Sequence, residues 1–154
     1  MHLLERLAQN NKSSEMYFLS DKNMDSKILR PRIPSNFFTR NGFEDDSIPR
    51  ISFAPSIDKC LMGLSQNLEG KRLYVHIPII ENKTKISKPT KIQVPDSQIT
   101  REIWILTDVK IKCIGTIIVK STPDNKSHKF SYGPNDKFTA ELWDWSWSWE
   151  NKFK

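Results

Sequence analysis

Residues 50–65 have the sequence RISFAPSIDKCLMGLS, which carries the clearest local signal in this chain. The first part, residues 50–54, predicts a β-strand that ends at a proline. In the second part, apolar residues recur with the i, i+3, i+4, i+7 spacing of a helix: Ile57, Cys60, Leu61 and Leu64. Ser56 is a favourable N-cap residue, and Asp58 would lie in the first turn, where a carboxylate suits the helix dipole. We therefore expect a strand that leads directly into a short helix.

Further strands are predicted where short apolar runs are bounded by polar residues. They lie at residues 16–20, 72–78, 102–106 and 110–120, and Gly115 predicts a β-bulge in the last of these. Leu3, Leu4 and Leu7 share one face of a predicted helix at residues 2–9. The order of these elements shows no βαβ alternation. The expected fold is therefore α+β, with a small twisted sheet, mixed or antiparallel, and one or two helices.

The length of 154 residues is typical of one domain, so we expect residues 1–154 to form a single unit. Residues 1–14 would be an N-terminal extension, residues 36–49 an irregular loop, residues 81–98 a basic loop or exposed hairpin, and residues 138–154 a tryptophan-rich C-terminal strand. No apolar run approaches the roughly 20 residues that span a bilayer, and no apolar stretch of signal-peptide length begins the chain. We therefore expect a cytoplasmic protein without a membrane partner.

Four tryptophans alternate with small or acidic residues in the sequence WDWSWSWE, residues 143–150. Because side chains alternate across a strand, this period places all four indoles on one face. The main interpretation is a closing strand whose indoles cover the core. Two alternatives are a stacking platform for a base or nicotinamide ring and a protein-contact patch.

Several kinds of chemistry lack their sequence signatures. The chain has no GxGxxG, GxxxxGK[ST], GxSxG or HExxH motif. Three histidines and two cysteines without CxxC spacing do not predict a metal site. His76 lies in the middle of a predicted strand, where a buried, hydrogen-bonded role is expected. Cys60 and Cys113 are expected to be buried free thiols, with a disulfide or metal site as the alternative.

Three segments, Met16–Ser20, Arg50–Ser65 and Arg101–Ile105, together resemble the three-part signature of the ADP-ribosyltransferase fold. In that family the first strand carries a His or Arg that holds the NAD ribose. The second strand ends in a short serine-rich turn that starts a helix. A later strand begins with a glutamate that stabilises the oxocarbenium-like transition state. The pattern of Pro31-Arg32-Ile33-Pro34 with Pro49-Arg50 also resembles small proteins of bacteria and their phages.

The resemblance implies an NAD-binding site and a role for each matching residue. Glu102 corresponds to the catalytic acid. The ligand-binding residues that it implies are Phe18, Ser20, Arg32, Arg50, Ser52 and Ser56. The first strand departs from the family pattern, since Phe18 stands where the ribose-holding histidine is expected. The pyrophosphate needs cations, and Arg30, Arg32 or Arg50 could serve, because a planar guanidinium can form paired hydrogen bonds with phosphate oxygens.

Other interpretations of these residues remain open. Glu102 could simply be the exposed first residue of a strand, and the two arginines could pair with Glu44, Asp45 or Asp46. A second function hypothesis is a non-enzymatic inhibitor, encoded by a phage or bacterium, that binds a host defence or regulatory protein. The net charge of +6 and the lysines of residues 83–91 give a third, nonspecific binding of nucleic acid.

Overall fold

The computed structural model describes residues 16–33, 47–64, 68–90, 101–120, 127–131, 139–143 and 145–153. The expected helix at residues 2–9, most of the loop at residues 36–49 and the second half of the basic segment lie outside the described residues. The described fold is α+β, with mostly antiparallel sheets and one helix.

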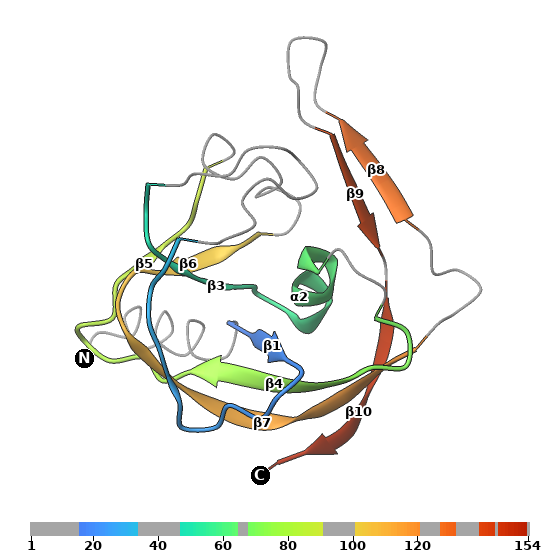
Figure 1. Ribbon diagram of the computed structural model, residues 1–154, viewed down its shortest axis with the longest axis horizontal. Coiled ribbons are helices and arrows are strands. Elements are labelled where there is room, and N and C mark those ends of the chain that lie inside the picture. Colours follow the sequence, from blue (N-terminus) through green and yellow to red (C-terminus); the bar gives the residue numbers. More distant parts are fainter. Residues whose placement is uncertain are drawn as a thin grey trace, which may run out of the picture.

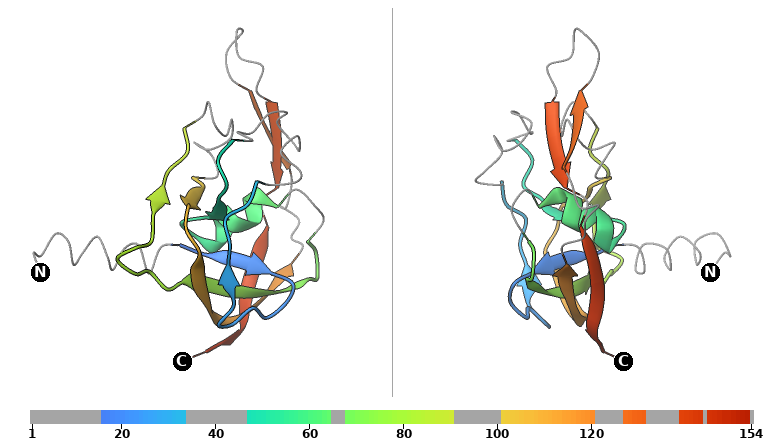
Figure 2. Two further views of the ribbon diagram at one scale, coloured as in Figure 1. Left: turned by 60° about the vertical axis from the view of Figure 1, so that its left-hand side comes forward. Right: turned by 90° about the vertical axis from the view of Figure 1, so that its right-hand side faces the viewer.

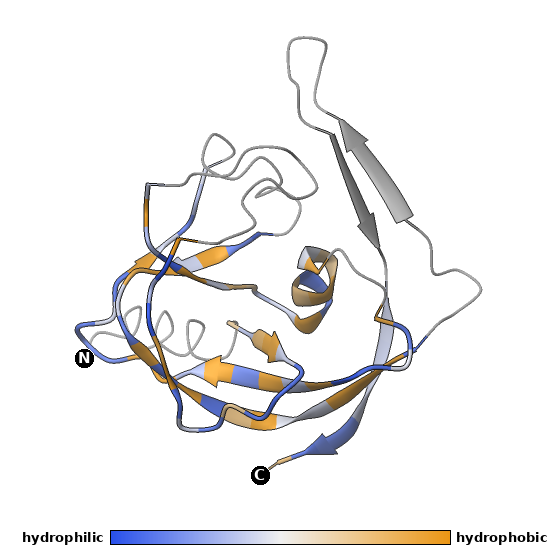
Figure 3. Ribbon diagram, viewed as in Figure 1, coloured by the Kyte–Doolittle hydropathy of each residue, from blue (hydrophilic) through white to orange (hydrophobic). Residues whose placement is uncertain are grey.

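The larger sheet has five strands arranged around one central strand (Figure 1). Its members are β1 (Phe18–Ser20), β2 (Ile28–Leu29), β4 (Arg72–Pro78), β7 (Val109–Lys120) and β10 (Ser146–Lys152). The order is β1-β4-β7-β10, and β2 also pairs with β7, in every case antiparallel. The long β7 thus holds three other strands. Hydrophobic and hydrophilic residues alternate at its start, residues 109–112, and its second half is mostly hydrophobic (Figure 3).

A smaller sheet of three strands faces the curved larger sheet. It consists of β3 (Ile51–Phe53), β6 (Ile103–Ile105) and β5 (Ile86–Ser87), with β6 in the middle. Two strands, β8 (Ser127–Ser131) and β9 (Thr139–Trp143), form an antiparallel ribbon that extends away from both sheets (Figure 2). Strand β8 is not predicted by the pattern of apolar runs, because its SHKFS sequence has a single bulky apolar residue.

The strand–helix junction forms as the sequence predicts. Helix α2 (Ile57–Gly63) begins after Ser56, whose Oγ accepts a hydrogen bond from the Lys59 backbone N–H at 3.1 Å. Ile57 and Leu61 are buried on the face of α2 that meets the larger sheet. No helix in the described part of the chain is long and apolar enough to cross a membrane.

Two hydrophobic clusters hold these layers together. The first lies between the smaller sheet and the start of β7; its buried members are Met16, Ile51, Phe53, Ile103, Ile105, Val109 and Ile111. The second lies between α2 and the rest of the larger sheet; its buried members are Ile57, Leu61, Leu68, Leu73, Val75, Ile117 and Val119. Strand β3 of the smaller sheet leads directly into α2, and the two clusters place the smaller sheet and α2 over different parts of the larger sheet.

The tryptophan-rich segment is divided between two strands. Trp143 ends β9, whereas Trp147 and Trp149 lie in β10, so residues 138–154 do not form the single strand that we expected. Trp145, Trp147 and Trp149 pack against the second cluster, which agrees with the core-covering interpretation for these three. Each of the three is only partly buried.

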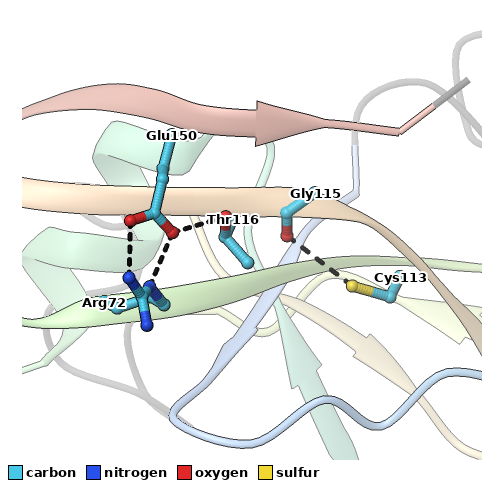
Figure 4. A network of polar contacts seen from close by, with 5 residues as sticks. All are labelled: Arg72, Cys113, Gly115, Thr116 and Glu150. Carbon is cyan, nitrogen blue, oxygen red and sulfur yellow. Dashed lines mark hydrogen bonds and ion pairs between the residues drawn. The ribbon is translucent and has the colours of Figure 1, made fainter.

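Polar side chains also connect the strands of the larger sheet. Arg72 of β4 donates two hydrogen bonds to Glu150 of β10, with N···O distances of 2.6 and 2.7 Å (Figure 4). Thr116 of the intervening β7 donates to the same carboxylate at 3.1 Å. The hydrogen bond from Arg72 lowers the pKa of Glu150. The network therefore spans three strands of the larger sheet, from the exposed Arg72 to the buried Thr116.

His76 joins β4 to two neighbouring segments through its ring. Its side chain is fully buried, and Nε2 accepts a hydrogen bond from the Met24 backbone N–H at 3.0 Å. Nδ1 lies 3.3 Å from the Phe18 carbonyl oxygen, to which it can donate only as N–H. This pair of contacts requires the neutral ring, and burial lowers the pKa of His76 below its ordinary value of 6.5.

Gly115 allows β7 to bend where both of its neighbours shift register. Ile114 is the extra residue opposite Val75 and His76, and Glu150 is the extra residue opposite Thr116 and Ile117. Gly115 has φ +153°, and a Cβ there would collide with the Asn151 backbone oxygen. The predicted bulge at Gly115 is therefore confirmed, and it requires glycine.

We expect Gly115→Ala to destabilise the domain by roughly 3 kcal/mol, because the backbone of β10 would have to move away from β7. Gly63→Ala is the matched control, since a Cβ at Gly63 meets no atom within 4 Å. It should leave the stability unchanged or raise it by about 0.5 kcal/mol, as alanine favours helix. The measurement is urea denaturation of both variants. Equal stabilities would contradict the role given to Gly115.

The free energy of unfolding should fall as the pH drops below 6.5. The unfolded chain then binds a proton at His76 that the folded chain excludes, which costs up to about 1.4 kcal/mol per pH unit. Denaturation at about pH 7.5 and about pH 5.5 would measure this loss. His76→Gln should be less stable at the higher pH but should show a smaller loss on acidification. Carboxylates titrate in both proteins, so an identical pH dependence would exclude His76 as the source.

Candidate functional site

The candidate site lies on the face of the smaller sheet that points away from the first hydrophobic cluster. Ser52 of β3 and Trp104 of β6 are directly opposite each other, so their side chains share this face. The alternation along each strand places Arg50 and Glu102 on the same side. Sequence-predicted site residues from two segments, fifty residues apart, are thus brought together.

Glu102 is held by two donors at one carboxylate oxygen. Ser52 Oγ donates a short hydrogen bond to Oε1, and Trp104 Nε1 donates to the same atom at 2.9 Å. Within the described part of the chain, no residue donates a hydrogen bond to Oε2. The arrangement fixes the orientation of the carboxylate and leaves one oxygen to accept a hydrogen bond from a ligand hydroxyl.

Arg50 lies against the ring of Trp104. The guanidinium carbon is 4.3 Å from the ring centroid, which is the geometry of a cation–π contact. Arg50 is 2% exposed, Trp104 is completely buried, and the guanidinium also donates to the Ile48 carbonyl oxygen at 3.2 Å. Arg50 therefore has a supporting role in the site. It does not offer its guanidinium to a ligand, because a ligand would have to displace other atoms to reach it.

Arg32 reaches the same face from a different segment. It forms an isolated antiparallel bridge with Arg50, with backbone N···O distances of 3.1 and 3.0 Å in the two directions. Directly paired residues point to one side of a sheet, so the Arg32 side chain leaves the sheet beside the Arg50 side chain. Arg32 is exposed. Glu44, Asp45 and Asp46 lie outside the described residues, so their pairing with either arginine stays a prediction.

The remaining sequence-predicted residues do not join this face. Phe18 packs against the first hydrophobic cluster, and its ring centroid lies 5.9 Å from those of Phe53 and His76. Ser20 Oγ accepts from the Lys22 backbone N–H, and Ser56 Oγ caps α2. The structure thus groups Arg32, Arg50, Ser52 and Glu102 and places Phe18, Ser20 and Ser56 in structural contacts.

The three strands of the proposed signature are nevertheless neighbours. Tyr17, just before β1, exchanges two backbone hydrogen bonds with Ala54, just after β3, at 2.8 and 3.1 Å. Strand β3 then pairs with β6 along its length. The first, second and third segments therefore lie side by side in that order.

Trp104 belongs to this face, although the sequence motifs do not single it out. Its spacing of two residues from Glu102 is a usable signal, because residues i and i+2 of a strand share a face. The contact with Arg50 was not foreseeable in this way, since it depends on the pairing between β3 and β6.

The thiols do not contribute a reactive group to this site. Both Cys60 and Cys113 are free, as expected. Cys60 Sγ donates to the Tyr17 carbonyl oxygen at 3.2 Å, and burial raises its pKa to about 12. Burial also raises the pKa of Cys113. Among the described residues, no group of three or more His, Cys, Asp or Glu side chains is arranged to hold a metal ion.

The two alternative functions, protein binding and nucleic-acid binding, would use other surfaces among the described residues. Ile28 and Ile79 are 55% and 42% exposed, and both lie beside Lys110 at the start of β7. A protein partner could contact these two isoleucines, between which Lys110 lies. For nucleic acid, Lys83 of the basic segment lies 3.5 Å from Glu81, which offsets part of its charge locally. Both alternatives stay predictions.

Comparison with known proteins does not assign the chain to a family. No protein-family model, curated protein or solved structure matches it. The grouped side chains of Arg32, Arg50, Ser52, Glu102 and Trp104, which we call the Arg32–Glu102 face, are therefore the basis for a functional proposal.

Arg50→Ala should destabilise the domain by about 2 kcal/mol, because it removes a buried side chain from the ring of Trp104. Arg30→Ala is the control. Arg30 pairs with Asp108 at 3.1 Å, but their side chains are 77% and 52% exposed, so the loss should stay within about 0.5 kcal/mol. Thermal and urea denaturation would measure both. Similar losses for the two variants would mean that Arg50 does not support the site.

Proposed function

We propose that this domain binds NAD or a related ADP-ribosyl nucleotide at the Arg32–Glu102 face, as a member of the ADP-ribosyltransferase-like fold with little or no turnover. The observation that carries the proposal is the fixed carboxylate of Glu102, which accepts hydrogen bonds from Ser52 and Trp104 at a single oxygen. The side-by-side order of β1, β3 and β6 supports it, since the resemblance requires these three segments to adjoin.

Glu102 would act on the ribose. Its second oxygen, Oε2, can accept a hydrogen bond from a ribose hydroxyl, and the negative charge beside the ring would stabilise the positive charge that develops when the nicotinamide–ribose bond breaks. Ser52 and Trp104 orient Oε2 by holding Oε1 in place. Without these two hydrogen bonds, the carboxylate would have to become ordered when the ligand binds.

Arg32 would hold the pyrophosphate. It is exposed, and it leaves the sheet on the face that carries Glu102. The buried Arg50 beside it contributes its positive charge to the same face without contacting the ligand. A planar guanidinium can donate two parallel hydrogen bonds to phosphate oxygens, which favours Arg32 over the surrounding lysines for this role.

The proposal of weak turnover is based on the first strand. Phe18 cannot donate or accept the hydrogen bonds of the expected histidine, and its ring packs in the core. His76 is its cross-strand partner but cannot substitute for it, because both ring nitrogens are engaged and the side chain is buried. Without a group that holds the ribose from this side, binding is the expected activity and bond cleavage would be slow.

Titration calorimetry with ADP-ribose and with NAD tests the proposal. Wild-type protein should bind at least one of them, and Glu102→Gln should weaken binding roughly tenfold or more, because a hydrogen bond to a charged group is lost. Arg32→Ala should weaken binding of ADP-ribose but not of nicotinamide riboside, which has no pyrophosphate. Glu81→Gln, which removes a carboxylate elsewhere, is the matched control and should bind as wild type does.

Absence of binding by both nucleotides at millimolar concentration would contradict the proposal. A separate assay for nicotinamide release tests the statement about turnover. Rapid release by the wild type that disappears in Glu102→Gln would show an active enzyme and would overturn the conclusion drawn from Phe18.

A further inference from the structure

The outer edge of β10 is a strand edge without a partner in the part of the chain that the structure describes. In the larger sheet β10 is the last strand, paired with β7 on one side only. Figure 1 shows it at the margin of the sheet. A free edge presents a row of backbone N–H and C=O groups that can pair with another strand.

The direction of these groups follows from the hydrogen bonds of Val119, which lies opposite Trp147. Val119 donates to the Lys71 carbonyl oxygen at 2.9 Å and accepts from the Gly70 N–H at 2.8 Å, both on the β4 side of β7. Trp147 therefore faces Val119 as a non-hydrogen-bonded pair, and its own N–H and C=O point outward. The same holds for Trp149, two residues further along.

Natural sheets protect such edges with charges, prolines or bulges. The bulge of β10 begins only after Trp149, and the charged side chains, Glu150 and Lys152, also follow it. The stretch Trp147-Ser148-Trp149 has none of these protections, and the indoles that flank Ser148 are only partly buried. Their centroids lie 5.7 Å apart in an edge-to-face arrangement.

This edge is complementary to itself. We infer that two copies of the chain associate through antiparallel pairing of β10 with β10, with the twofold axis at Ser148. Trp147 of each copy then pairs with Trp149 of the other, and all four of these residues direct their N–H and C=O groups toward the partner strand. The pairing joins two sheets into one and brings four indoles together on the same face, where cross-strand aromatic pairs are favourable. A twofold interface requires this kind of self-complementarity.

The size of the contact sets its strength. A pairing of a few residues buries less than the roughly 1,600 Å² of a standard stable interface, so the dimer should be reversible and depend on concentration. The inference is independent of nucleotide binding, because β10 contributes no residue to the Arg32–Glu102 face.

Charges at Ser148 test the twofold axis directly. The side chain of Ser148 lies on the opposite face of the sheet from the indoles, and the two copies of it would be cross-strand neighbours. Ser148→Lys and Ser148→Asp each place like charges across the axis, so sedimentation velocity should show each variant as a monomer at concentrations where the wild type dimerises. An equimolar mixture of the two should dimerise again, at least as strongly as the wild type. Ser87→Lys, on β5, is the control for an added surface charge and should leave the dimer intact.

Each outcome decides the inference. A wild-type protein that stays monomeric up to sub-millimolar concentration overturns it. Dimerisation of both charge variants, or failure of their mixture to associate, overturns the pairing at Ser148. Recovery in the mixture also shows that the separate variants are folded, because only folded edges can pair.

Discussion

The structure depends on one central strand, β7. Every other strand of the larger sheet pairs with it directly or through β4, and its apolar residues contribute to both hydrophobic clusters. A strand of this length cannot stay flat, because strands twist and a long sheet must bend to enclose a core. Gly115 provides the bend at the point where the pairing with β4 and with β10 changes register. The close approach of the β10 backbone at this point leaves no room for a side chain.

The segment between β1 and β2 completes one edge of β7. The Asp25 carboxylate accepts the Cys113 backbone N–H at 2.8 Å, and the Ser26 N–H bonds to the Ile111 carbonyl oxygen at 2.9 Å. These contacts occupy the interval between β2 and β10, where β7 would otherwise expose backbone groups. His76 fastens the same segment from β4 through Met24. The neutral, buried ring of His76 thus has a structural role, and neither of its nitrogens is free to act in catalysis.

The candidate site uses a part of the molecule that the core does not require. Alternation in β3 and β6 sends Ile51, Phe53, Ile103 and Ile105 to the first cluster and leaves the other face for polar groups. On that face the buried pair of Arg50 and Trp104 lies beside the Glu102 carboxylate, whose Oε1 accepts hydrogen bonds from Ser52 and Trp104. Burial of the Arg50 guanidinium removes a charge from water, and the contacts with the Trp104 ring and the Ile48 carbonyl oxygen offset part of that cost.

The sequence by itself determined the elements whose signals are local. Apolar periodicity and the N-cap Ser56 defined α2, short apolar runs bounded by polar residues defined β4 and β7, and an isolated glycine in a strand indicated the bulge. Tertiary structure decided which of these segments meet. The pairing of β3 with β6 joined Ser52 to Glu102, although neither residue carries information about the other in its own neighbourhood. The tertiary structure also decided that Phe18 packs against the first cluster and that both ring nitrogens of His76 make hydrogen-bond contacts. It likewise divided the tryptophans between β9 and β10. The physical reason is that strand pairing joins residues far apart in the sequence. It depends on the total burial and hydrogen bonding of the whole sheet, and no short stretch of sequence contains that information.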